Sequence, residues 1–290
     1  MSNPILRDDV TPTSPRQFLA DALDPVAFDG TRSEALHARL LARARARIEA
    51  GARHTRVRAD GENWAPVVDG VRVKLLNDGA STRSVLVEFE PGAALPMHRH
   101  HEHEQCLVLR GDLQMDDLDI RASDYHEAPA GSRHGRVRST GGGLIYLRGV
   151  SLGSTAGVVL DMLTAWLPGR GDAPRTIRAA EGAWADLAPG VQAKRLFDGA
   201  DETSMLLRLQ PGAHAPAGLS TPEGEYLLLE GEGYVGDTLL RAGEYDYAHR
   251  DVPAFDLSSG VGALFYLHGK VTQALRTNQG RVLPGTRAAR

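Results

Sequence analysis

The amino-acid sequence predicts an all-β protein built from two copies of one domain, preceded by a short helical segment. Three observations lead to this prediction: a repeat at a fixed offset, short apolar segments between turn residues, and helical spacing near the N-terminus. The 290 residues amount to about twice the common domain size, which fits two domains. The 32 glycines and 16 prolines punctuate apolar runs, which is typical of many tight turns between strands.

The repeat has an offset of 120 residues, at which Trp64 aligns with Trp184 and Lys74 with Lys194. Further matches in the same register are Asp78-Gly79 with Asp198-Gly199, Pro91-Gly92-Ala93 with Pro211-Gly212-Ala213, Gly111 with Gly231, Tyr125 with Tyr245, Tyr146-Leu147 with Tyr266-Leu267, and Gly149 with Gly269. Coincidental glycine and proline spacing cannot account for matched tryptophans, lysines and tyrosines. The chain therefore contains two copies of one domain.

Within each copy the pattern predicts short strands. In the first copy the expected strands cover residues 72–76, 84–90, 105–110 and 144–148, which are rich in Val, Leu and Ile. Asp-Gly, Pro-Gly and Gly-Asp pairs separate them. Short strands at this spacing indicate a β-sandwich or a β-barrel.

The first 52 residues differ in character and favour helices. Ser14-Pro15 suits the start of a short helix that carries Phe18, Leu19 and Leu23 on one side. A second helix follows the Thr31-x-x-Glu34 capping box, ends at Gly51 and carries these apolar residues at helical spacing: Leu36, Leu40, Leu41 and Ile48. We interpret this segment as a brace packed on a barrel or as a dimer contact.

The expected organisation is a helical segment at 1–52, a first barrel at 53–150, a linker and strand at 151–174, a second barrel at 175–270 and a tail at 271–290. The 33 Lys and Arg against 37 Asp and Glu, without a basic block, argue against a nucleic-acid partner. One cysteine cannot form an internal disulfide, and no run of 18 apolar residues exists. The N-terminus carries acids where a signal peptide needs an apolar run, so we expect a cytoplasmic protein without a membrane partner.

The stretch from 91 to 111 contains a metal-ligand pattern. His98, His100 and Glu104 share one parity, so on a strand their side chains point to one face, the barrel interior. A Pro-Ala-Gly turn further along leads to His134, which can approach from a neighbouring strand. Three imidazoles and one carboxylate suit iron, manganese, nickel, copper or zinc and leave coordination positions open.

The two segments resemble the paired motifs of the cupin superfamily. Its first motif, G-x5-H-x-H-x3-E-x6-G, is matched at every fixed position, by Gly92, His98, His100, Glu104 and Gly111. In its second motif, G-x5-P-x-G-x2-H-x3-N, the matching residues are Pro129, Gly131 and His134, while Ser123 replaces the first Gly and Arg138 the final Asn. The resemblance implies two tandem double-stranded β-helix, or jelly-roll, barrels. It also implies one divalent transition metal held by these residues: His98, His100, Glu104 and His134.

Other polar residues near the motif have no counterpart in it. We expect His101, Glu102, His103 and His126 to form a solvated rim at the barrel mouth. Cys106 shares the parity of Glu104 and points inward, where it is either a small buried apolar residue or a redox-sensitive thiol.

The second copy has lost the ligand set. In the 120-residue register the four ligand positions are occupied by these residues: Gly218, Ser220, Gly224 and Ala254. We therefore expect a metal-free second barrel that serves as a structural lid, a dimerisation element or an altered small-molecule pocket. The polar residues nearby are interpreted as scattered surface groups: His214, Glu223, Glu225 and His249.

Residues 16–149 resemble the ChrR-type cupins, found in anti-sigma factors and in some stand-alone oxygenases. The phrases that carry this resemblance are DALDPVAF, LLARARARI, RVRADGENW and DYHEAPAGSRH. The zinc-binding His-x3-Cys-x2-Cys helix of the anti-sigma domain has no counterpart, because the single cysteine lies in the expected barrel.

Two functions follow from the resemblance. One is a non-haem metal-dependent dioxygenase acting on a small diketone or hydroxyketone-like substrate, and its catalytic residues beyond the metal ligands are unknown. The other is a regulatory cupin that responds to an oxidant or small ligand and signals through its helical segment. In both cases we expect a small-molecule ligand and a homodimer.

Overall fold

The structure of the chain is a computed structural model that describes residues 30–79, 83–149, 173–216 and 218–270. It divides into two units, one ending at Glu49 and one beginning at Ala50. The short helix expected after Ser14-Pro15 lies outside the described residues. Within the described residues, no helix has the length and apolar character that crossing a bilayer requires.

Helix α2 (Gly30–Gly51) confirms the expected second helix, which begins next to the Thr31 capping box and ends at the predicted glycine. Its four large apolar residues are exposed: Leu36, Leu40, Leu41 and Ile48.

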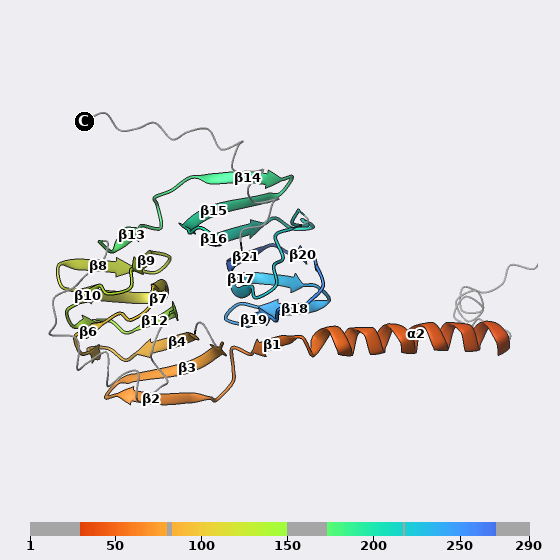
Figure 1. Ribbon diagram of the computed structural model, residues 1–290, viewed down its shortest axis with the longest axis horizontal. Helices are drawn as coiled ribbons and strands as arrows, with labels where there is room; N and C mark the ends of the chain where they lie inside the picture. Colours follow the sequence, from red (N-terminus) through yellow and green to blue (C-terminus); the bar gives the residue numbers. More distant parts are fainter. Residues whose placement is uncertain (1–29, 80–82, 150–172, 217, 271–290) are drawn as a thin grey trace, which may run out of the picture. The chain divides into compact units, whose positions relative to one another are not determined.

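The first repeat forms a barrel (Figure 1), and its described residues contribute eleven strands. These are β2 (Trp64–Val68), β3 (Val71–Asp78), β4 (Arg83–Phe89), β5 (Ala94–Leu95), β6 (His98–Arg99), β7 (Glu104–Met115), β8 (Leu118–Arg121), β9 (Tyr125–Ala128), β10 (Arg133–His134), β11 (Val137–Arg138) and β12 (Gly143–Arg148). The four strands expected from the sequence are confirmed as β3, β4, β7 and β12.

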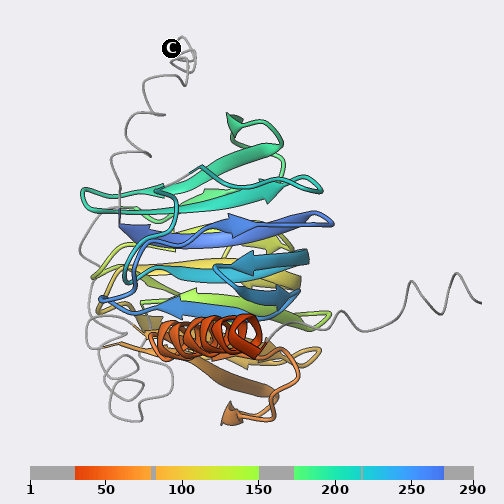
Figure 2. The same cartoon turned by 90° about the vertical axis from the view of Figure 1, so that its right-hand side faces the viewer.

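The second repeat forms an equivalent barrel. Its strands are β14 (Trp184–Ala188), β15 (Val191–Asp198), β16 (Glu202–Leu209), β17 (Glu225–Val235), β18 (Thr238–Arg241), β19 (Tyr245–Ala248), β20 (Leu257–Ser258) and β21 (Ala263–Lys270). The main sheet runs β2-β3-β4-β12-β7-β9 in the first barrel and β14-β15-β16-β21-β17-β19 in the second. Trp64 and Trp184 begin equivalent strands in these sheets, as the repeat predicts. Figure 2 shows the strands of both barrels along their length.

Each barrel also takes up one strand from the other half of the chain. Strand β1 (His54–Val57) precedes the first barrel but pairs with β19 of the second. Strand β13 (Arg175–Ile177) precedes the second barrel but pairs with β9 of the first (Figure 1). This reciprocal exchange, which the repeat register does not reveal, completes each sheet with a segment of the other repeat.

Three apolar clusters fill the barrels and the space between them. One lies inside each barrel, and the third is shared by both. Because alternate residues of a strand face opposite sides, Cys106 and Val108 of β7 face the first barrel's interior while Leu107 faces the second barrel. The shared cluster contains equivalent residues from the two repeats: Leu107 and Leu227, Tyr125 and Tyr245, Tyr146 and Tyr266.

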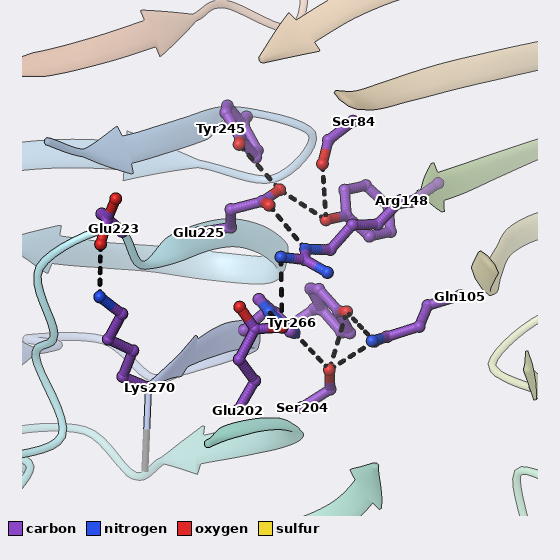
Figure 3. A network of polar contacts seen from close by, with 12 residues as sticks. Ser84, Gln105, Arg148, Glu202, Ser204, Glu223, Glu225, Tyr245, Tyr266 and Lys270 are labelled. Atoms are coloured by element: carbon purple, nitrogen blue, oxygen red, sulfur yellow. Dashed lines mark hydrogen bonds and ion pairs between the residues drawn. The ribbon is translucent and has the colours of Figure 1, made fainter. Parts of the chain in front are cut away.

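A polar network crosses this shared core (Figure 3). The carboxylate of Glu225 accepts a hydrogen bond from Arg148 Nε at 2.9 Å and one from the Tyr146 hydroxyl at 2.6 Å. Tyr245 donates a third bond at 2.9 Å. Burial opposes ionisation of Glu225, but the charge of Arg148 outweighs it, so the pKa of Glu225 lies below its ordinary value. The expectation that Glu225 is a surface group is wrong: a lone barrel exposes this face, but the neighbouring barrel covers it.

A second branch of the network joins Gln105 of the first barrel to the other repeat. Its side-chain oxygen accepts a hydrogen bond from Ser204 at 2.5 Å and one from the Tyr266 hydroxyl at 3.2 Å (Figure 3). Both bonds are buried. Apolar packing, exchanged strands and satisfied polar groups thus make the two barrels one structural unit.

Candidate metal centre

Three of the four predicted ligands meet in the first barrel. The short strands β6 and β10 pair antiparallel, with His98 opposite His134. His100 follows directly after β6, and one ring nitrogen from each of the three histidines lies within 4.8 Å of the other two. The ring centroids are 4.5 to 5.2 Å apart. Such a spacing lets three imidazoles hold a single ion.

The predicted Pro-Ala-Gly turn brings His134 to this position. Gly131 has φ +84°, a conformation that favours glycine, and Ser132 N–H donates to the Pro129 carbonyl at 3.0 Å to close the turn. The turn is tied to the other motif, because His100 exchanges backbone bonds with Ser132 at 3.0 Å and Gly131 at 2.7 Å. The local sequence of the second motif therefore sets the distance between the two histidine-bearing segments.

Backbone carbonyls orient two of the rings. His98 Nδ1 lies 3.0 Å from the Pro96 carbonyl oxygen, and His134 Nδ1 lies 3.0 Å from that of Gly135. A carbonyl can only accept, so Nδ1 carries the proton and Nε2 keeps its lone pair. Neutral imidazoles with Nε2 available are the form that ligates a metal.

Glu104, the fourth predicted ligand, begins β7 and lies beside the histidine group. Its Oε2 is 3.4 Å from His100 Nδ1, although its oxygens are outside the 4.8 Å group. Burial opposes ionisation of Glu104, but the charge and hydrogen bond of His100 and the nearby His98 and His134 outweigh it and lower its pKa to about 2. Burial, reinforced by His98 and His100, lowers the pKa of His134 to about 4. At neutral pH the group therefore offers a carboxylate and a neutral imidazole, which suit a divalent transition metal.

Two further side chains, Cys106 and His126, face the interior of the first barrel beside the histidine group, a region that we call the metal chamber. Cys106 is 4% exposed in the apolar cluster, and burial raises its pKa well above the ordinary value, which agrees with a small apolar role. His126 of β9 is opposite Cys106 and is 6% exposed. The expectation that His126 belongs to a solvated rim is therefore wrong, because β9 turns this residue inward.

The remaining residues expected at the rim differ in their exposure to solvent. His101 and Glu102 are exposed, as expected. His103 is half-buried, with its ring 4.8 Å from that of Phe197 in the second repeat. Burial lowers the pKa of His103.

Thr176 contacts the inward-facing His126 and was not identified from the sequence. Its hydroxyl lies 2.9 Å from His126 Nδ1, and it comes from the exchanged strand β13. No local pattern marks it, because the two residues are 50 positions apart.

In the second barrel the equivalent position is filled. A side chain at Gly224, the counterpart of Glu104, would place its Cβ 2.7 Å from both the Thr221 and the Tyr226 hydroxyls. The Tyr226 ring contacts Phe255, which in turn contacts the ring of His54 from exchanged strand β1. Within the described residues, the histidine group of the first barrel is the cluster suited to a metal.

Comparison with known proteins agrees with this architecture. Residues 52–151 match the family described as the ChrR Cupin-like domain. The fold is similar to a protein of Pseudomonas aeruginosa assigned as glyoxylate-induced, with a TM-score of 0.57, 14% identity and coverage of 75% of this chain and 89% of that one. It is also similar to a Nostoc punctiforme protein assigned as a dioxygenase, with a TM-score of 0.53, 18% identity and coverage of 77% of this chain and 80% of that one. A third similar structure is the oxalate decarboxylase of Lactobacillus farciminis, with a TM-score of 0.54, 12% identity and coverage of 74% of this chain and 85% of that one. The comparison with curated proteins finds no match.

The chain has the fold of two tandem cupin barrels. Its first barrel matches the ChrR Cupin-like domain, and its second is a copy in which the ligand positions carry other residues.

Proposed function

We propose that the first barrel is a metal-dependent active site that acts on a small oxygenated substrate such as a β-diketone or hydroxyketone, in a dioxygenase reaction. The residues that would hold the metal are His98, His100, Glu104 and His134. The single observation that carries the proposal is the convergence of three imidazole nitrogens within 4.8 Å. One divalent ion per chain, of iron, manganese, nickel, copper or zinc, fits this donor set.

When bound, the metal supplies a Lewis acid and a template for an oxygenated substrate and dioxygen. The carbonyl contacts of His98 and His134 keep their Nε2 atoms directed for ligation. Glu104 adds a negative charge that offsets part of the metal's own. The apolar wall of the chamber, which includes Val73, Val87 and Ile145, limits the access of water.

Activity and metal binding are tested together. Iron-loaded protein should consume oxygen when given acetylacetone, and His100→Ala should abolish both iron binding and oxygen uptake. His101→Ala, which alters an exposed neighbouring histidine, is the matched control and should retain both. Flat oxygen traces across diketones and hydroxyketones with iron, manganese, nickel and copper would contradict the enzyme.

A second candidate function is a sensor, in which the same site detects an oxidant or ligand and signals through α2. The exposed apolar residues of α2, such as Leu40 and Ile48, favour it because they offer a surface to a partner. A cytoplasmic homodimer is part of both proposals, and light scattering tests the dimer. The sensor predicts no multiple turnover, but oxidant-dependent protease cleavage near Gly51.

A further inference from the structure

The inner faces of β7 and β9 bring a second polar side chain close to the candidate ligands. Because paired residues of an antiparallel ladder point to the same face, His126 projects inward beside Cys106, one alternate position from Glu104 on β7. Apart from Glu104, the inward residues nearest to it on these two strands, Cys106, Val108 and Ala128, are apolar or weakly polar. His126 therefore adds hydrogen-bonding capacity to an otherwise apolar wall.

The second half of the chain holds this histidine in place. Strand β13 pairs with β9 so that Thr176 lies opposite His126, with its hydroxyl 2.9 Å from Nδ1. The neighbouring pair in the same ladder is also tied, because Arg175 Nε donates to Glu127 at 2.8 Å. A substitution at Thr176 can therefore remove the histidine contact while these other contacts keep the strand attached.

The partner of Nδ1 distinguishes His126 from two of the proposed ligands. His98 and His134 face carbonyls, which accept only and so leave Nε2 with a lone pair. Thr176 presents a hydroxyl, which both donates and accepts. The ring of His126 is thus held in either tautomer, and its Nε2 can donate a hydrogen bond as well as accept one.

The equivalent position of the second barrel shows the contrasting arrangement. Asp246, the counterpart of His126, is fully buried and bonded on both carboxylate oxygens by residues of exchanged strand β1. His54 Nδ1 lies 2.6 Å from one oxygen, and Arg56 Nε donates to the other at 2.8 Å. In that barrel the exchanged strand contacts both oxygens of the inward carboxylate, whereas in the first barrel it contacts one nitrogen of the His126 ring.

We propose that His126 contacts the ligand in the metal chamber, through a hydrogen bond from Nε2 to an oxygen of a small chelating oxygenated compound such as a β-diketonate, and that Thr176 positions it. This inference rests on the proposed function of the site. It assigns the second repeat a direct part in that site, since the exchanged strand β13 supplies the positioning residue.

The experiment uses full-length protein loaded with Co²⁺, whose visible spectrum reports ligand binding without requiring turnover. Acetylacetone is titrated at constant pH, and bound cobalt is measured separately by elemental analysis. His126→Leu should weaken acetylacetone binding by about tenfold, the loss of one hydrogen bond, with one cobalt still bound. Thr176→Val should weaken it by about threefold, and Thr176→Ser, which restores the hydroxyl, should bind like the wild type.

The outcomes separate this inference from the proposed function. A wild type that takes up no cobalt overturns both. A cobalt-loaded His126→Leu protein with unchanged acetylacetone affinity overturns the inference alone, as does equal weakening in Thr176→Ser and Thr176→Val. Should His126→Leu fail to fold by circular dichroism, the Val and Ser pair at Thr176 decides the result by itself.

Discussion

The two barrels keep the same scaffold around different interiors. Lys74 and Lys194 are both buried, and each ammonium group donates to backbone carbonyls of the segment before its barrel, including Arg58 at 2.5 Å and Ala179 at 2.8 Å. Gly111 and Gly231 both have φ near +78° and leave no room for a Cβ beside the backbone of the facing turn. These contacts maintain the fold, so they persist whether or not a site is present.

The difference lies in what occupies the barrel interior. The first barrel places small or polar residues there, such as Cys106 and His126, around the histidine group. The second replaces them with Tyr226 and Asp246, and the Phe255 ring packs against Tyr226. The barrel that lacks the ligand set is thus also the one whose interior is filled by large side chains, which teaches that one scaffold supports two different interiors.

The largest expected effect concerns the shared core, which makes the two barrels interdependent. Glu225→Ala should lower the free energy of unfolding by about 3 kcal/mol, because it removes the buried carboxylate that pairs with Arg148 at 2.9 Å and leaves that arginine only the longer contact to the half-exposed Glu202 at 3.6 Å. Urea unfolding measures the loss. The matched control is Glu223→Ala, which breaks exposed ion pairs and should cost less than about 1 kcal/mol. Equal losses in the two variants would mean that the shared network does not couple the barrels.

Acid should destabilise the metal-free protein through the first barrel. The pKa of His134 is about 4 when folded against 6.5 ordinarily, so the unfolded chain binds more protons and stability falls as pH drops from 6.5 to 4. The pKa of Glu104 is about 2 when folded against 4.5 ordinarily, so this group also lowers the stability as pH drops, between pH 4.5 and 2. The His134 contribution is on the order of 3 kcal/mol.

Thermal unfolding of metal-free wild type and His134→Gln at pH 7.5, 5.5 and 4.5 measures this effect. The variant should lose less stability than the wild type across that range. Parallel curves for the two proteins would show that His134 is not the group responsible.

A smaller effect is expected where the second chamber is filled. Gly224→Ala should destabilise the protein by about 1 to 3 kcal/mol, because the added Cβ meets the Thr221 and Tyr226 hydroxyls at 2.7 Å. Gly260→Ala is the control, since nothing lies within 4 Å of its Cβ position, and its effect should stay within about 0.5 kcal/mol. A Gly224→Ala protein as stable as the wild type would mean that the second chamber still has room for a ligand side chain.

The smallest effect concerns Cys106. Its burial and raised pKa keep it a protonated thiol, so a thiol reagent such as DTNB should react slowly with native protein and rapidly in urea. Rapid, stoichiometric labelling of native protein at pH 8 would instead support the redox-sensitive interpretation.

The sequence was sufficient for the strands and the histidine group because both depend on local spacing. His98 and His100 are alternate residues of one motif, and the turn before His134 is encoded in consecutive residues. The direction of His126 was missed because both faces of β9 are buried, and so no alternation of polar and apolar residues marks the inner one. The exchanged strands and the burial of Glu225 depend on how two barrels pack, which no local pattern records.

Metal stoichiometry tests the central claim, that one barrel keeps a metal site and the other has lost it. Elemental analysis of full-length protein, purified without a histidine tag and then loaded, should give one equivalent of metal per chain. His134→Ala should bind none, while His101→Ala should still bind one. Two equivalents in the wild type, or one equivalent retained by His134→Ala, would contradict the account.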